Sequence, residues 1–108
     1  MKIHLAEPIN TYFQLNNGAD TTQVNRCFAE SATVKDEANE YQGLAAIEAW
    51  LTQARKTFQF TSTPLSTNKQ GNQDIVLAEV RGNFPGSPIQ LHYAFVVNNG
   101  KIHALEIF

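Results

Sequence analysis

The sequence predicts an α+β fold in which helices come first and an antiparallel sheet follows. Apolar residues recur at helical spacing up to about residue 58, and beyond it they alternate as in strands. The chain has 108 residues, of which 43% are hydrophobic and 17% charged. That composition is typical of a globular protein, and the length suits a single domain, residues 1–108, with one modest core.

The first helix is predicted to begin near Pro8, because proline suits the first turn of a helix, where its missing N–H would have no partner. Ile9, Tyr12 and Phe13 follow at spacings that place them on one face. The segment NNGAD then ends the helix at Gly18, since glycine is the usual residue just past a helix C-terminus.

A second helix is predicted to open at Asp20, whose side chain would cap it, with Gln23 completing a capping box. Its inner face would be formed by three apolar residues: Val24, Cys27 and Phe28. A short strand, residues 32–35, is expected next.

The longest helix is predicted to follow Gly43, where the apolar stripe is clearest. Arg55 and Lys56 lie near its end, where positive charge favours the helix dipole. The stripe consists of Leu44, Ile47, Trp50, Leu51, Ala54 and Phe58.

Four strands are predicted after this helix: residues 58–67, 75–81, 89–97 and 102–108. Pro64 indicates an edge strand or a bulge in the first of them. In the last strand the apolar residues Ile102 and Leu105 have opposite parity, which also indicates a bulge. A curved sheet and a long amphipathic helix would enclose a cone, whose open end is a natural small-ligand cavity. The third strand is the most regular, with Ile89, Leu91, Tyr93, Phe95 and Val97 on one face.

Charge and composition exclude several classes of partner. The net charge is −2 and no Lys/Arg cluster occurs, so we expect no binding to nucleic acid and none to an anionic membrane surface. No apolar run approaches the ~20 residues needed to span a bilayer, and the N-terminal segment does not have the pattern of a signal peptide. A cytoplasmic location is therefore expected.

Metal and thiol chemistry are not expected either. Cys27 is the only cysteine, which excludes an intramolecular disulfide and a thiolate metal cluster. The three histidines, His4, His92 and His103, have no paired spacing. The sequence predicts neither a metal site nor a cofactor.

Four segments, NNGAD, CFAESATVKDE, YQGLAAIEAW and NNGKIHALEI, together with the order of elements, carry a family resemblance. The chain resembles the NTF2-like (cystatin-like) superfamily, specifically its SnoaL-like branch, which is related to ketosteroid isomerases and polyketide cyclases. The resemblance covers nearly the whole chain and implies a cone-shaped fold. It also implies a homodimer that packs through the sheet.

The resemblance to steroid isomerases implies two catalytic residues. Tyr12 falls where their helix-one tyrosine stabilises the substrate oxyanion, and Asp36 falls where their proton-shuttling aspartate lies. Their third group, a protonated aspartic acid, has Leu91 as its counterpart here, or His92 if the alignment shifts by one residue. The resemblance therefore implies only half of that oxyanion hole.

Each of these residues also has a purely structural interpretation. Asp36 follows Ala32 and Val34 by four and two residues, so it shares their side of the strand. If that side is the cavity, desolvation would raise its pKa and help it act as a base. If not, Asp36 is an exposed carboxylate entering a loop, and Tyr12 is a core aromatic.

An apolar ligand would be bound by aromatic residues, although most of these could equally be core residues. His92 is a further candidate, but it lies on the strand face opposite Tyr93 and would then point outward, toward a dimer interface. The aromatic candidates are Trp50, Phe58, Phe60, Phe84, Tyr93 and Phe95.

These observations favour a cofactor-independent isomerase or cyclase acting on an apolar, carbonyl-bearing molecule. Asp36 would move a proton alpha to the carbonyl, and Tyr12 would stabilise the enolate oxygen. The alternative is a non-catalytic ligand-binding or dimerisation module of the same fold. A protein-interaction domain like the nuclear transport factor is a third hypothesis.

Overall fold

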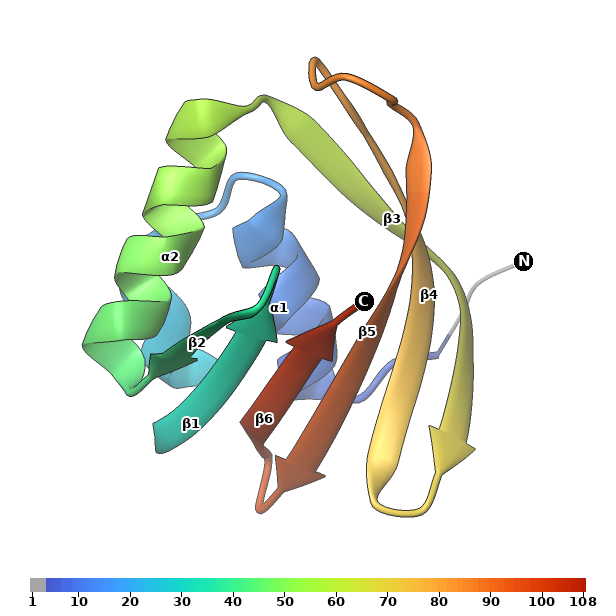
Figure 1. The fold of residues 1–108 in the computed structure, drawn as a ribbon. Helices are drawn as coiled ribbons and strands as arrows, with labels where there is room; N and C mark the ends of the chain where they lie inside the picture. The colour runs from blue at the N-terminus through green and yellow to red at the C-terminus, as the bar shows by residue number, and fades with distance from the viewer. Residues whose placement is uncertain (1–3) are drawn as a thin grey trace.

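The computed structural model describes residues 4–108. Two helical segments precede the first two strands, a long helix follows them, and four strands complete the chain (Figure 1). In chain order the elements are α1 (Glu7–Asn16), the 3₁₀ helix η1 (Thr21–Arg26), β1 (Phe28–Asp36), β2 (Asn39–Gln42), α2 (Leu44–Thr57), β3 (Phe60–Gln70), β4 (Gln73–Gly82), β5 (Ile89–Asn98) and β6 (Lys101–Ile107).

The strands form one curved six-stranded sheet in the order β2-β1-β6-β5-β4-β3. Figure 1 shows α1 and α2 on the same, concave side of this sheet. The predicted α+β cone is thus confirmed. The sheet is mixed and not wholly antiparallel as predicted, because β1 and β6 run parallel while the other neighbouring strands are antiparallel. The β1–β6 pair joins the first half of the chain to its last strand.

The segment between α1 and α2 differs from the prediction. Asp20 caps η1 as expected, with its Oδ1 accepting a hydrogen bond from the Thr22 backbone N–H at 3.0 Å. The predicted capping box is wrong, because the Gln23 side chain donates to the hydroxyl of Thr22 instead of accepting from the backbone N–H of Asp20. Phe28 begins β1 instead of ending a helix, and the predicted strand 32–35 is only the second half of β1.

The strand β2 was not predicted. Its four residues, NEYQ, are mostly exposed, and so they carry no apolar alternation that could signal a strand. It pairs with β1 through a two-residue turn at Glu37 and Ala38, both of which have positive φ, 51° and 67°.

The long helix ends one residue earlier than its apolar stripe suggested. Ile47 and Leu51 are buried as predicted, but Phe58 has an extended backbone and is 40% exposed. Its side chain therefore does not continue the buried face of α2.

Both predicted strand irregularities are present. The β3–β4 register shifts between Pro64 and Ser66, and the β5–β6 register shifts between Val96 and Val97. The second shift leaves His103 unpaired between Ile102 and Ala104, so that Ile102 and Leu105 can both be buried.

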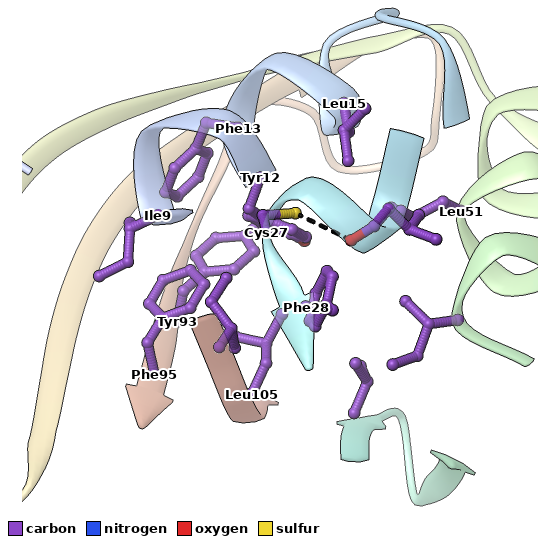
Figure 2. Packing of buried hydrophobic residues seen from close by; sticks show 14 of the residues in the cluster. Ile9, Tyr12, Phe13, Leu15, Cys27, Phe28, Leu51, Tyr93, Phe95 and Leu105 are labelled. Atoms are coloured by element: carbon purple, nitrogen blue, oxygen red, sulfur yellow. Dashed lines mark hydrogen bonds between the residues drawn. The ribbon is translucent and has the colours of Figure 1, made fainter. Parts of the chain in front are cut away.

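The core lies between α1, η1, α2 and the concave face of the sheet. Figure 2 shows its centre, where rings from α1 meet rings from β5. Tyr12 packs edge-on against Phe13, Phe28 and Phe95, with ring centroids 5.2, 5.9 and 5.5 Å away. Such edge-to-face pairs add about 0.5–1.5 kcal/mol each beyond the burial of area. This aromatic cluster fixes α1 on the sheet.

Candidate active site

Asp36 is the last residue of β1, and its side chain lies on the concave face of the sheet. Val34, two residues earlier, is fully buried in the core, and strand alternation places Asp36 on the same face. In the register of the sheet Asp36 is opposite Ile107 of β6, which is in turn opposite Tyr93 of β5. The three residues therefore form one row across the concave face.

The long helix supplies a direct partner for the carboxylate. Trp50 of α2 donates a hydrogen bond from its indole N–H to Asp36 Oδ2 at 3.1 Å. Tyr41 of β2 stacks on the indole, with ring centroids 5.8 Å apart and an interplanar angle of 27°. Both aromatic residues are half-buried, so Asp36 is held against an apolar wall without being sealed from solvent.

This environment raises the pKa of Asp36 above its usual value. Desolvation is the largest cause, the hydrogen bond from Trp50 opposes it, and the nearby charge of Glu37 adds to the rise. A carboxylate with a raised pKa is a stronger base toward a carbon acid than an ordinary surface aspartate. Asp36 is therefore not the exposed loop residue of the structural interpretation.

The position of Asp36 is fixed by a tight turn. Asp36 pairs with Asn39 across the β1–β2 hairpin, and the two central residues of the turn, Glu37 and Ala38, adopt left-handed conformations. Turns of this kind usually carry Asn or Gly there, because other residues incur a steric cost. The side chain of Asp36 is thus held at the strand end by backbone geometry as well as by Trp50.

A groove of about 300 Å³ lies beside this strand end. It is lined by residues 35–40 of the β1–β2 hairpin together with Glu106 and Ile107 of β6. Asp36 therefore borders a concave surface that a small ligand could enter.

Tyr12 lies deeper than the resemblance to steroid isomerases implies. Its side chain is completely buried among the core aromatics, with its ring centroid 6.0 Å from that of Tyr93. Burial raises the pKa of Tyr12 well above its usual value, and the charges of Tyr93, Asp36 and Cys27 add to the rise. Asp36 is thus close enough to Tyr12 to affect its pKa, but of the two side chains only that of Asp36 is in contact with solvent.

A buried polar network, which the sequence did not indicate, lies next to these residues. The Asn16 side chain donates to Ser62 Oγ at 2.8 Å, and Ser62 Oγ lies 3.4 Å from the hydroxyl of Tyr93. Burial raises the pKa of Tyr93, the hydrogen bonds from Ser62 and Asn16 oppose the rise, and Asp36 adds to it. The only feature of the sequence that could have indicated this network is Ser62, a polar residue at an inward-facing position of β3.

The structure separates the remaining ligand-binding candidates into three groups. Trp50 contacts Asp36 directly, while Tyr93 and Phe95 belong to the aromatic core. Phe58 and Phe84 pair with each other at the end of α2, and Phe60 lies under Arg55. His92 is exposed on the opposite face of β5 from Tyr93 and stacks on Phe108 at 5.2 Å.

Other chemistry is not indicated by the described residues. Among residues 4–108, no group of three or more His, Cys, Asp or Glu side chains is placed to hold a metal ion. The Cys27 thiol is buried, and desolvation raises its pKa to about 12, so it stays protonated. No helix in this part of the chain is long and apolar enough to cross a membrane.

The fold and the comparisons place the protein in a known class. Cone-shaped structures with a six-stranded sheet and helices on its concave face are NTF2-like, and solved structures of this class superpose on the chain. The SnoaL-like domain model matches residues 9–104, and the chain therefore belongs to the SnoaL-like domain family.

The solved structures include one with substantial sequence identity. A proposed polyketide cyclase from Sinorhizobium meliloti is 38% identical, with a TM-score of 0.90 over 96% of this chain and 95% of that one. A protein from Catenulispora acidiphila with a ketosteroid isomerase-like fold, solved with trimethylamine, is 15% identical, with a TM-score of 0.84 over 97% and 86% of the two chains. No curated protein matches the sequence.

The raised pKa of Asp36 predicts a specific pH dependence of stability. Because the folded-state pKa is higher than the unfolded one, the protonated carboxyl stabilises the fold at low pH, and this contribution is lost as pH rises through the folded pKa. Asp36→Asn removes the titration. Urea unfolding from pH 4 to 7 should show the wild type losing stability relative to Asp36→Asn as pH rises.

Glu30, which is exposed on the same strand, supplies the control, because Glu30→Gln changes charge by the same amount and Glu30 is not among the groups that shift the pKa of Asp36. Parallel pH profiles for the wild type and Asp36→Asn would contradict the raised pKa.

Proposed function

We propose that the protein is a cofactor-independent isomerase or cyclase that moves a proton alpha to a carbonyl of an apolar small molecule. The observation that carries the proposal is the Asp36 carboxylate, half-buried at a strand end, with a raised pKa and a hydrogen bond from Trp50. The family, and the similarity to a proposed polyketide cyclase, support the same class of chemistry.

In the proposed mechanism Asp36 is the general base. One oxygen of its carboxylate accepts the indole N–H of Trp50, which leaves the other oxygen free to take a proton from a substrate carbon. The C–H electron pair moves into the carbonyl to form an enolate. The protonated Asp36 then returns the proton at a second carbon that is conjugated with the enolate. In the cyclase case the enolate carbon instead attacks a second carbonyl of the substrate, whose C=O π bond opens to an alkoxide that takes the proton from Asp36.

The negative charge that develops on the enolate oxygen must be stabilised by a hydrogen-bond donor. Tyr12 and Tyr93 have hydroxyls with raised pKa values, so both stay protonated and able to donate. Tyr93 is additionally anchored by Ser62. Because both tyrosines are buried, a ligand can reach them only if the side chains that cover them move.

Proton exchange tests this proposal without knowledge of the natural substrate. The protein is incubated in deuterium oxide with a panel of apolar cyclic ketones, and deuterium incorporation alpha to the carbonyl is followed by NMR. We expect catalysed exchange in the wild type and a loss of about 10²–10⁴-fold in Asp36→Asn, the usual contribution of a positioned general base.

Glu30→Gln, at an exposed position of the same strand that does not line the groove, serves as the matched control and should retain the exchange activity. Ligand-induced chemical-shift changes without exchange would instead support the alternative, a non-catalytic ligand-binding module. Exchange that survives in Asp36→Asn would contradict the assigned base.

We also propose that the protein forms a homodimer through the convex face of the sheet. Apolar side chains, half-buried except for the buried Ala94, follow one another across that face. Figure 1 shows no helix on this side of the sheet. Val96 is registered with Ala104 of β6, and Ala94 with Ile75 of β4. Leu77 extends the same face. Such a surface is of the kind that protein interfaces bury.

Light scattering of the purified protein at micromolar concentration should give twice the monomer mass. Val96→Glu places a charge in the proposed interface and should shift the mass to the monomer, whereas Gln53→Glu, at an exposed position of α2 away from the sheet, should not. A wild-type protein that is only monomeric would refute the dimer.

A further inference from the structure

A second concave site lies where α2 ends and β3 begins, and it is larger than the groove beside Asp36. Its volume is about 480 Å³, within the range of small-molecule sites. The two sites share no lining residue. The lining consists of Asn17, Arg55, Gln59, Phe60, Thr61 and Arg81, which includes two cations and no acidic residue.

Arg55 is held in place before any ligand arrives. Its Nη1 donates to the backbone carbonyl of Asn16, and its guanidinium lies over the ring of Phe60, 5.5 Å from the centroid. A side chain at Gly18 would crowd it, since a Cβ there would be 3.2 Å from Nη2. A planar guanidinium fixed in this way loses little conformational entropy when it binds an anion.

Arg81 of β4 lines the same groove. Strand alternation directs its side chain to the sheet face opposite to that of Phe60 and Arg55, so it reaches the groove around the edge strand β3. Its Nη2 is 3.2 Å from Glu79 Oε1, and this pair is exposed, so its contribution to stability is small. A guanidinium has five N–H donors, and the single contact to Glu79 leaves most of them free. The groove therefore has one anchored and one adjustable guanidinium, from two different elements.

Neutral donors complete the lining. The Asn17 amide is fixed by two hydrogen bonds with the backbone of Ser62, at 2.8 and 2.7 Å. The backbone of Gln59 is held by Asn83, which contributes its side-chain oxygen and its own N–H, both at 3.0 Å. These bonds hold the backbone of Gln59 in place, and its exposed side chain lines the groove together with Arg55 and Arg81.

We propose that this groove binds the phosphate group of a small soluble molecule. Two guanidiniums match the double negative charge of a phosphate monoester, and their forked donors can each bind two of its oxygens. The amides of Gln59 and Asn17 add neutral hydrogen bonds to the same group. The net charge of −2 on the whole chain opposes an anionic bilayer, so a soluble phosphate ester, not a lipid headgroup, is the assigned ligand.

Titration with inorganic phosphate, followed by NMR of the arginine side chains and the Gln59 amide, tests the proposal. We expect saturable shifts at Arg55, Arg81 and Gln59. Arg81→Gln should weaken phosphate binding about tenfold or more, the effect of losing a charged hydrogen-bonding pair. Glu79→Gln frees Arg81 and removes a competing charge, so it should strengthen binding.

The matched control is Lys56→Gln, which removes one positive charge from the neighbour of Arg55 without altering the lining. A loss as large in Lys56→Gln as in Arg81→Gln would overturn the proposal, because it would show general attraction to positive charge. Acetate binding as tightly as phosphate, or no saturable shift at millimolar phosphate, would overturn it as well.

Cosedimentation with vesicles containing phosphatidic acid tests the choice of a soluble ligand. We expect the protein to remain in the supernatant, and sedimentation that depends on Arg81 would contradict this choice. Phosphate binding is independent of the proton-exchange activity assigned to Asp36, so either proposal can fail without the other.

Discussion

The hydrogen bond between Trp50 and Asp36 is the contact on which the candidate site depends. It connects the long helix α2 to the last residue of strand β1. Without it, a half-buried carboxylate would lack a partner, and such a group either becomes protonated or turns to solvent. The bond keeps the carboxylate in place but lowers the pKa less than burial raises it.

The same balance between burial and hydrogen bonding governs the interior behind Asp36. Tyr93 is buried but keeps a polar partner in Ser62, which Asn16 in turn supports. Tyr12 is enclosed by aromatic rings and serves first to fix α1 on the sheet. The polar side chains on this face therefore differ in burial: Asp36 is half-buried, whereas Tyr93 and Tyr12 are buried in the core.

Much of the fold was predictable because its signals are local. The apolar stripe of α2 and the alternation in β5 follow directly from residue spacing, and even the bulge near His103 was visible as a change of parity. The strand β2 and the β1–β6 pairing were not predictable, because the first lacks apolar residues and the second joins distant segments. Likewise Asp36 could be named from the sequence, whereas Trp50 as its donor and Ser62 as the partner of Tyr93 depend on tertiary packing.

If the fold prepares Asp36 for proton transfer, the titration of the Asp36 carboxyl must show it. Carbon NMR of the Asp36 side-chain carboxyl, followed as a function of pH, gives the pKa of Asp36 in the wild type and in Trp50→Phe. We predict a pKa above the usual 3.8 in the wild type and a further rise in Trp50→Phe, because the hydrogen bond from Trp50 lowers it. A wild-type pKa at or below 3.8, unchanged in Trp50→Phe, would contradict the account.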